Sequence, residues 1–427
     1  RSGIERAWET LLRGQRGKKR IYVDARGRRS RLVPQGVPMA DEEPVPGRDL
    51  TLTLDMELLR SIERAFRGHP SGAAVVVDVH TGKVRALFSK PAYDLNEVSG
   101  KLSGERAREL NENPFRPMID KTLFETYYPG STFKPVSALA ALGEGTIDEE
   151  TEVDCHGVYE FGNRRFRCEH VHGRISLKEA LRRSCNIYFY KVAELTGMDQ
   201  IARMASDLGL GEKTGIGINT EARGFIPTKG WYEERGEVFR VGYTLNAAIG
   251  QGDTRVSLMQ LALTYAAIAN GGTLFAPQLV ESVHAPDGAL LERISPQVKK
   301  RLSLKPEHLK LIHEALWGVV NREGGTAYDP SNLEGPVRVA GKTGTAQVEQ
   351  HQRERNDEKR SWYVYRSHAW FAGWAPAEAP ELAVVVMVEH GGVGGKNAAP
   401  IAIEAMKQYF GRRAGQVTLI NRADGAL

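Results

Sequence analysis

The chain has 427 residues, of which 41% are hydrophobic and 26% charged, so it is long and apolar enough to bury a sizeable core. Three cysteines are too few for a disulfide scaffold, and no run of about 18 apolar residues is present to span a membrane. The first 48 residues hold 12 Lys and Arg against 6 Asp and Glu, which accounts for the net charge of +5. They lack the interleaved aromatic residues of a nucleic-acid-binding surface, so we expect them to face an anionic membrane surface or polymer.

Residues 1–48 begin with a short amphipathic helix pattern and continue into Arg/Gly-rich and Pro-rich sequence. From Leu50 the pattern changes. Residues 55–66 predict a helix, and residues 73–79 and 83–88 predict two strands of a hairpin. Residues 91–127 are polar and show no regular period, so we expect irregular structure there.

Helical periodicity dominates the middle of the chain, and strands return near its end. The predicted helices span 131–142, 176–183, 187–196, 199–208, 255–269 and 306–321. Strands are predicted at 337–347, 368–374 and 382–389, before a closing helix at 400–410. Because strands stand at both ends with helices between them, we expect an α+β fold with an antiparallel sheet completed by distant segments.

The segment before the helix at 131–142 carries a chemical motif, Tyr-Pro-Gly-Ser131-Thr-Phe-Lys134. Pro-Gly favours a turn, and a spacing of three puts Ser131 and Lys134 on one helix face. A serine hydroxyl becomes a nucleophile when a neighbouring group takes its proton, and a lysine does so when its pKa is depressed. The helix start adds backbone N–H groups that stabilise an oxyanion. Ser-x-x-Lys alone is nevertheless more typical of a helix cap followed by a surface lysine.

Two further motifs change this interpretation. Ser184-Cys185-Asn186 lies 53 positions after Ser131, and Lys342-Thr343-Gly344-Thr345 follows an apolar segment far downstream. In this order the three motifs match the signature set of penicillin-binding proteins and serine β-lactamases. The chain resembles the transpeptidase domain of the class B penicillin-binding proteins, most closely the elongation-type subgroup, penicillin-binding protein 2, over residues 49–412. Supporting segments lie at Ala248–Gly252, Trp370–Gly373 and Leu52–Asp55.

The resemblance implies the penicillin-binding, serine-transpeptidase fold, in which helices flank a five-stranded antiparallel sheet and the active site lies between the sheet edge and an all-helical part. It implies that residues 1–48 are a partial non-catalytic pedestal or linker, residues 49–412 the transpeptidase domain and residues 413–427 a C-terminal tail. The alternative for 1–48 is an expression remnant with no fold of its own. Residues 349–367 are charged without an apolar period, and we expect a mobile surface loop or a lid over the cleft.

By resemblance, Ser131 attacks the carbonyl between the last two D-alanines of a peptidoglycan stem peptide and forms an acyl-enzyme. Lys134 is the expected base, and the nearby charge of Lys342 would help to keep it neutral. Ser184 would relay a proton to the leaving amine, and Asn186 would hold Lys134 and the substrate amide.

The Lys-Thr-Gly segment reads as a strand, and Gly344 would leave room for a peptide to add beside it as an extra strand. The peptide's terminal carboxylate would meet Thr343, Thr345 and Lys342, and the resemblance implies that the amides of Ser131 and Thr345 form the oxyanion hole. A phosphate loop is a poor alternative, because five residues rather than four separate Gly335 from the Gly-Lys pair and no helix follows.

The cysteines lie within 31 residues in the pattern Cys155-x12-Cys168-x3-His172-x12-Cys185, which is compatible with a tetrahedral structural zinc site. Some elongation-type relatives are known to bind zinc in this loop through the cysteine of the Ser-x-Asn motif and a histidine before a glycine, and this sequence has both, as Cys185 and His172. Cys155 and Cys168 would replace aspartates of those relatives. Zinc would fix Cys185 so that its neighbours point into the cleft. The alternative is a Cys155–Cys168 disulfide with Cys185 free; spare candidate ligands are His156 and His170.

The resemblance implies a D,D-transpeptidase of cell elongation that β-lactams acylate and that needs no catalytic cofactor. It also implies a place on the periplasmic face of the inner membrane, an anchor preceding Arg1, and partnership with a SEDS-family glycan polymerase and elongation-complex proteins. One alternative is a D,D-carboxypeptidase or β-lactamase, although the sequence offers no clear group for activating water. The other is a penicillin sensor or idle scaffold that activates a polymerase, which the intact motifs argue against.

Overall fold

The computed structural model describes residues 3–21, 23, 26–29, 41–100, 102–347 and 366–424. Two compact units are present. The smaller one is drawn from Arg1–Thr53, Gly217–Asn219 and Leu279–Ser295, and the larger one holds the rest of the chain. The loop predicted at 349–367 falls almost entirely outside the described residues. No helix in the described ranges has the length and apolar character needed to cross a membrane.

The smaller unit contains two short helices, α1 (Gly3–Ala7) and α2 (Glu9–Leu12), and a sheet in the order β1 (Asp49–Leu52), β9 (Val280–His284), β10 (Leu290–Arg293). Backbone bridges join Gln15 to Val45 and Lys18 to Glu42. The described part of residues 1–48 therefore contains helices and paired backbone segments.

The larger unit is built on one five-stranded sheet, which confirms the predicted fold class. Every neighbouring pair is antiparallel, in the order β12 (Ala340–Ala346), β13 (His368–Ala375), β14 (Leu382–Val388), β2 (Gly72–Asp78), β3 (Val84–Lys90). All residues of β13 and β14 are buried, because helices cover both sheet faces. The outermost strand β12 carries the Lys-Thr-Gly motif.

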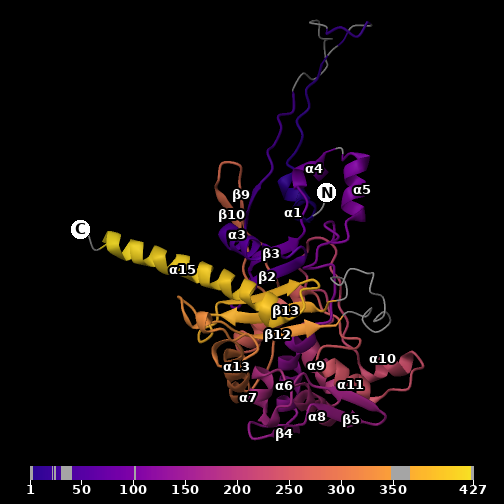
Figure 1. The fold of residues 1–427 in the computed structure, drawn as a ribbon. Helices are drawn as coiled ribbons and strands as arrows, with labels where there is room; N and C mark the ends of the chain where they lie inside the picture. Colours follow the sequence, from indigo (N-terminus) through magenta and orange to yellow (C-terminus); the bar gives the residue numbers. More distant parts are fainter. Residues whose placement is uncertain are drawn as a thin grey trace. The chain divides into compact units, whose positions relative to one another are not determined.

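Helices cover the two faces of the sheet (Figure 1). On one face pack α3 (Met56–Ala65) and the long α15 (Ala399–Asp424), and on the other α12 (Leu258–Ala269) and α13 (Pro306–Asn321). Every residue of α12 is buried, as expected for a helix that is apolar on all sides. Ser257 and Gln260 form a capping box at its start.

The all-helical part packs α6, α7, α8, α9 and α11 against one another and against α13. These helices span Lys134–Gly143, Leu177–Arg182, Asn186–Thr196, Met198–Asp207 and Val241–Ala248. The remaining elements are α4 (Leu95–Ser99), α5 (Gly104–Glu112), η1 (Gly130–Phe133), β4 (Glu152–Cys155), β5 (Val158–Phe161), β6 (Arg164–Arg167), β7 (Gly173–Ser176), α10 (Lys229–Glu234), β8 (Thr273–Phe275), β11 (Val298–Arg301), η2 (Pro330–Leu333) and α14 (Gly394–Asn397).

The prediction of irregular structure at 91–127 is wrong in part, because α4 and α5 lie there. Their starts are capped by Asp94, which accepts from the Asn96 amide, and by Ser103, which accepts from the Arg106 amide. Such caps stabilise a helix whose sequence lacks a clear apolar stripe.

Candidate active site

Ser131 lies in the 3-10 turn η1, directly before the helix α6, whereas the sequence predicts an α-helix that starts at Ser131. Gly130 has a φ of 55°, and its amide donates to the carbonyl of Gly250 at 2.9 Å. The Tyr265 hydroxyl donates to the Thr132 carbonyl at 2.8 Å, which ties the turn to the buried helix α12. Within the described residues, the half-buried Ser131 makes no side-chain hydrogen bond, so its hydroxyl is available to a substrate.

Lys134, the first residue of α6, is completely buried and directs its amine to the Ser-x-Asn motif. Nζ lies 2.8 Å from the Ser184 carbonyl, 3.2 Å from Ser184 Oγ and 2.7 Å from Asn186 Oδ1. Burial lowers the pKa of Lys134 from its ordinary value to about 8. The structure therefore brings together Lys134, Ser184 and Asn186, as the sequence predicts, next to the turn that carries Ser131.

A strained backbone delivers the Ser-x-Asn motif. Ser184 has a φ of 57°, in the left-handed region that non-glycine residues seldom adopt. This turn allows both the carbonyl and the hydroxyl of Ser184 to face Lys134. The chain then enters α8, for which Cys185 is the N-cap and accepts from the amide of Tyr188.

Strand β12, at one edge of the sheet, carries Lys342, the second buried lysine of the site. Lys342 is completely buried, and Nζ donates to the carbonyl of Thr343 at 3.1 Å. Burial, assisted by the charge of Lys134, lowers the pKa of Lys342 well below its ordinary value. The sequence predicts that Lys342 keeps Lys134 neutral. In the structure burial is the main cause for both groups, and the Coulombic effect falls on Lys342.

Thr343 and Thr345 point to the opposite face of β12 from Lys342, because side chains alternate along a strand. Thr343 is nearly buried and its Oγ1 lies 2.6 Å from Thr326 Oγ1, whereas Thr345 is exposed. The carbonyl of Thr345 lies 3.0 Å from where a Cβ on Gly130 would stand. The η1 turn and Thr345 are thus direct neighbours.

The structure gives a different reason for Gly344 from the one predicted. A Cβ at Gly344 would lie 3.0 Å from the carbonyl oxygen of Pro129 and 3.0 Å from Thr132 Cγ2. The missing side chain therefore lets the serine turn pack against β12, and the room predicted for a substrate backbone is taken by the protein. A peptide adding to this strand would use its outer edge.

Asn186 is held by the cysteine-containing loop. Its Nδ2 donates to the carbonyl of Arg167 at 3.2 Å, and its backbone amide donates to Cys168 Sγ at 3.2 Å. The predicted contact of Asn186 with Lys134 is present. Asn186 is also predicted to hold the substrate amide, but its side-chain amide nitrogen already donates to the carbonyl of Arg167. Loop and active site are thus linked by two hydrogen bonds.

The four predicted metal ligands converge, and their ligand atoms all lie within 4.8 Å of one another. His172 Nδ1 is 3.4 Å from Cys155 Sγ and 3.5 Å from Cys168 Sγ, and the sulfurs of Cys168 and Cys185 are 3.9 Å apart. A tetrahedral Zn²⁺ with ordinary bond lengths places its ligand atoms about 3.5–3.8 Å apart, so the donor set fits this ion. All three cysteines are free thiols, and the alternative Cys155–Cys168 disulfide is not formed.

Glu389 forms a buried ionic network with Ser71, Tyr127 and Arg116 that is not predicted from the sequence. Glu389, 4% exposed, accepts from the hydroxyl of Tyr127 at 2.9 Å and from Ser71, and pairs with Arg116 at 3.3 Å. Burial alone would raise the pKa of Glu389, but the Ser71 hydrogen bond and the charge of Lys121 outweigh it and lower this pKa. A carboxylate directly after the wholly apolar strand β14 is the sequence signal that could have revealed the network.

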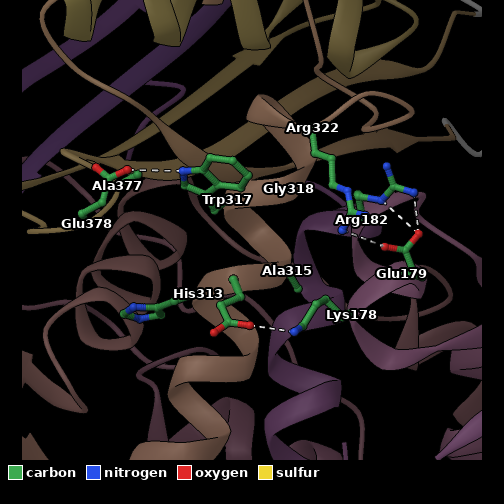
Figure 2. A pocket seen from close by; sticks show the side chains of 11 residues that line it. Lys178, Glu179, Arg182, His313, Ala315, Trp317, Gly318, Arg322, Ala377 and Glu378 are labelled. Atoms are coloured by element: carbon green, nitrogen blue, oxygen red, sulfur yellow. Dashed lines mark hydrogen bonds and ion pairs between the residues drawn. The ribbon is translucent and has the colours of Figure 1, made fainter. Parts of the chain in front are cut away.

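A separate pocket of about 400 Å³ lies between α7 and α13 (Figure 2). Its charged side chains are mostly paired with one another, as in Lys178–Glu314 and Arg182–Glu179. None of the predicted catalytic residues lines it; the lining residues are Lys178, Glu179, Arg182, His313, Glu314, Ala315, Trp317, Gly318, Arg322, Ala377 and Glu378.

The chain is similar to known protein families and proteins over nearly its whole length. The family profile described as "Penicillin binding protein transpeptidase domain" matches residues 72–407, and the one described as "Penicillin-binding Protein dimerisation domain" matches residues 1–52. The Haemophilus influenzae protein named peptidoglycan D,D-transpeptidase MrdA is 33% identical over 430 residues. That match covers 98% of this chain and 64% of the relative, so the chain spans less than two thirds of the relative's length.

Solved structures of penicillin-binding proteins are also similar to this chain. Pseudomonas aeruginosa PBP2, solved in complex with WCK 5153, is 31% identical with a TM-score of 0.79, covering 96% of this chain and 83% of that one. Helicobacter pylori PBP2, solved in complex with MreC, is 29% identical with a TM-score of 0.80, covering 96% of this chain and 72% of that one.

Proposed function

Since this chain belongs to the penicillin-binding protein transpeptidase family, we propose that it carries a D,D-transpeptidase that cross-links peptidoglycan stem peptides during cell elongation. The observation that carries the proposal is the buried amine of Lys134, held between Ser184 and Asn186 beside the serine turn. Relatives similar in sequence over nearly the whole chain are named for this activity.

The first half of the reaction forms an acyl-enzyme. Neutral Lys134 takes the proton of the Ser131 hydroxyl, and Oγ attacks the carbonyl carbon between the two D-alanines. The backbone amides of Ser131 and Thr345 stabilise the oxyanion, in keeping with the close approach of η1 to Thr345. The C–N bond then breaks, and the proton passes through Ser184 to the leaving D-alanine amine.

The second half transfers the acyl group. The amine of a second stem peptide attacks the ester carbonyl, Lys134 receives the proton lost by that amine, and the Ser131 hydroxyl is restored. The donor peptide lies along the outer edge of β12 as an added strand, with its terminal carboxylate at the hydroxyls of Thr343 and Thr345. Lys342 is completely buried on the opposite face of this strand and its pKa is strongly lowered, so its predicted contact with the carboxylate is not part of the proposal. A β-lactam enters the same path and stops at the acyl-enzyme.

The cysteine cluster holds a structural zinc in this proposal. Cys155, Cys168, His172 and Cys185 would bind it, and its contribution is mechanical because it closes the loop that holds Asn186. The hydrogen bonds from Asn186 to Arg167 and Cys168 support this role.

The cellular setting follows from the family. We propose a position on the periplasmic face of the inner membrane, an N-terminal anchor, and contacts with a SEDS-family glycan polymerase and elongation-complex proteins. The Helicobacter pylori relative solved with MreC supports the last of these.

The test is fluorescent penicillin labelling of the wild type and Ser131→Ala, followed by product analysis with stem-peptide substrates. We expect label only on the wild type and cross-linked dimers as the product. If free tetrapeptide forms without dimers, the activity is that of a carboxypeptidase and not of a transpeptidase. If the label is released rapidly, the activity is that of a β-lactamase. Labelling without turnover of any stem peptide would favour a penicillin sensor, and no labelling an idle scaffold.

A further inference from the structure

A hydroxyl pair joins the Lys-Thr-Gly strand to the loop after α13. Thr326 Oγ1 and Thr343 Oγ1 lie 2.6 Å apart, a short distance even for an O–H···O hydrogen bond. Thr343 is 6% exposed, so little solvent reaches its hydroxyl, and Thr326 is the partner of that hydroxyl among the described residues. The role of Thr326 as donor or acceptor in this pair therefore decides where the Thr343 proton points.

The backbone of Thr326 is fixed on three sides. Its amide donates to the Arg182 carbonyl at 3.4 Å, and the next amide, of Ala327, donates to the Val319 carbonyl at 3.0 Å. On the third side its carbonyl oxygen lies only 2.0 Å from where a Cβ on Gly395 would stand, so a glycine is required there. The Thr326 hydroxyl is thus presented to Thr343 by a rigid loop.

Arg182 reinforces the same loop from the side of α7 (Figure 2). The Arg182 side chain is 14% exposed, and its guanidinium donates to the carbonyl of Glu323 and pairs with Glu179. Gly318 and Gly324 leave space for it, since a Cβ at either would lie 3.2 or 3.3 Å from the Arg182 side chain. Arg182 is the last residue of α7 and stands two residues before Ser184. The end of this helix therefore contacts the loop that carries Thr326 and leads directly into the Ser-x-Asn motif.

Donor counting then sets the direction of the hydrogen bond. A threonine hydroxyl has one proton to donate, and a carboxylate only accepts. Resting on the proposed function, we propose that Thr326 is a positioning residue. Its hydroxyl donates to Thr343 Oγ1, so that the Thr343 proton is left to hold the carboxylate of the stem peptide or β-lactam. A hydroxyl that accepts one hydrogen bond is also a stronger donor in the next.

The test compares Thr326→Val, which removes the hydroxyl at nearly constant volume, with Thr326→Ser, which retains it. Acylation by benzylpenicillin is separated into a dissociation constant and an acylation rate constant, and benzylpenicillin methyl ester serves as a ligand without the carboxylate. We expect Thr326→Val to weaken benzylpenicillin binding about three- to tenfold, with the acylation rate constant nearly unchanged. Thr326→Ser should bind like the wild type, and the ester should bind equally to all three proteins.

The proposal is overturned if Thr326→Val binds benzylpenicillin like the wild type, if Thr326→Ser is equally defective, or if the ester loses as much affinity as the acid. Should Thr326→Val not fold, Thr326→Ala carries the same comparison. A wild type that is acylated at Ser131 while these variants show no difference removes the role of Thr326 and leaves the proposed transpeptidase intact.

Discussion

Lys134 Nζ lies 2.7 Å from Asn186 Oδ1, although 52 residues separate the two positions. This amide oxygen and the Ser184 carbonyl, at 2.8 Å, can only accept hydrogen bonds. A neutral lysine amine has two N–H groups and one lone pair, so these two acceptors occupy both donors. The lone pair is left to accept a hydroxyl proton, as a base requires. Among the described residues the Ser184 hydroxyl faces it at 3.2 Å, and the Ser131 hydroxyl must approach the same lone pair to be deprotonated.

Acylation should rise with pH through the pKa of Lys134. Burial lowers this pKa to about 8, so the neutral base accumulates above that pH and falls about tenfold for each unit below it. We expect the benzylpenicillin acylation rate constant to increase from pH 6 to a plateau above pH 9. Thermal unfolding at each pH controls for loss of the folded state. A flat profile between pH 6 and 9 would remove Lys134 as the base.

Asn186→Asp should move that profile to higher pH. A carboxylate in place of the amide puts a negative charge beside the amine and favours its protonated form, which raises the pKa of Lys134. We expect the midpoint of the acylation profile to rise by about one unit or more, with slower acylation at pH 7. Lys191→Gln, on the same helix but outside the Lys134 hydrogen bonds, is the control. An unchanged midpoint in Asn186→Asp would contradict the structure.

Metal binding should be tied to acylation through Cys185. Elemental analysis of the purified, tag-free protein should give one zinc per chain, and Cys185→Ala should lose it and acylate more slowly with Ser131 untouched. Removal of a group that only supports a metal ligand commonly costs about 10- to 100-fold in metal affinity or activity, so loss of the ligand itself should cost at least as much. The matched control is His156→Ala, because His156 is exposed and outside the cluster. Equal acylation rates in the wild type and Cys185→Ala would reject the coupling.

Glu389→Gln should destabilise the fold, because it removes the buried negative charge that faces Arg116 and the buried Lys121, although Arg116 keeps its ion pair with Glu125. We expect the free energy of unfolding at pH 7 to fall by about 3 kcal/mol in urea titrations. Glu381→Gln breaks an exposed pair with Arg413 and should cost less than about 1 kcal/mol.

The pH dependence gives a second check on Glu389. Its folded-state pKa lies below the ordinary 4.5, so its contribution to stability is present above pH 4.5 and is lost as the pH falls through the lower folded value. The wild type should therefore lose stability below pH 4.5 more steeply than Glu389→Gln. Parallel stability curves for the two proteins would contradict the assigned network.

Sequence patterns were sufficient for the sheet and for the three motifs. Strands such as β14 are apolar at every position, which marks a strand buried on both faces, and the motif spacing marks the chemistry. Contacts made by backbone carbonyls escaped prediction, as at Arg167 with Asn186, because any residue type supplies a carbonyl. The Thr326–Thr343 pair escaped because two common residues 17 positions apart carry no signal until the fold joins them.

Gly344 shows a subtler limit. The sequence indicates that a side chain is excluded there, but only the fold shows that Pro129 and Thr132 are what excludes it. Capped helices such as α5 were missed because a single N-cap hydrogen bond, at Ser103, outweighs a weak apolar pattern.

The central claim is that Ser131 is the nucleophile of this pocket, and the most direct measurement is to locate the acyl group after reaction with benzylpenicillin. Proteolysis and mass spectrometry of the wild type should find a single adduct on the Ser131 hydroxyl, and none in a folded Ser131→Ala variant. An adduct at another residue, or one retained by Ser131→Ala, would contradict the account.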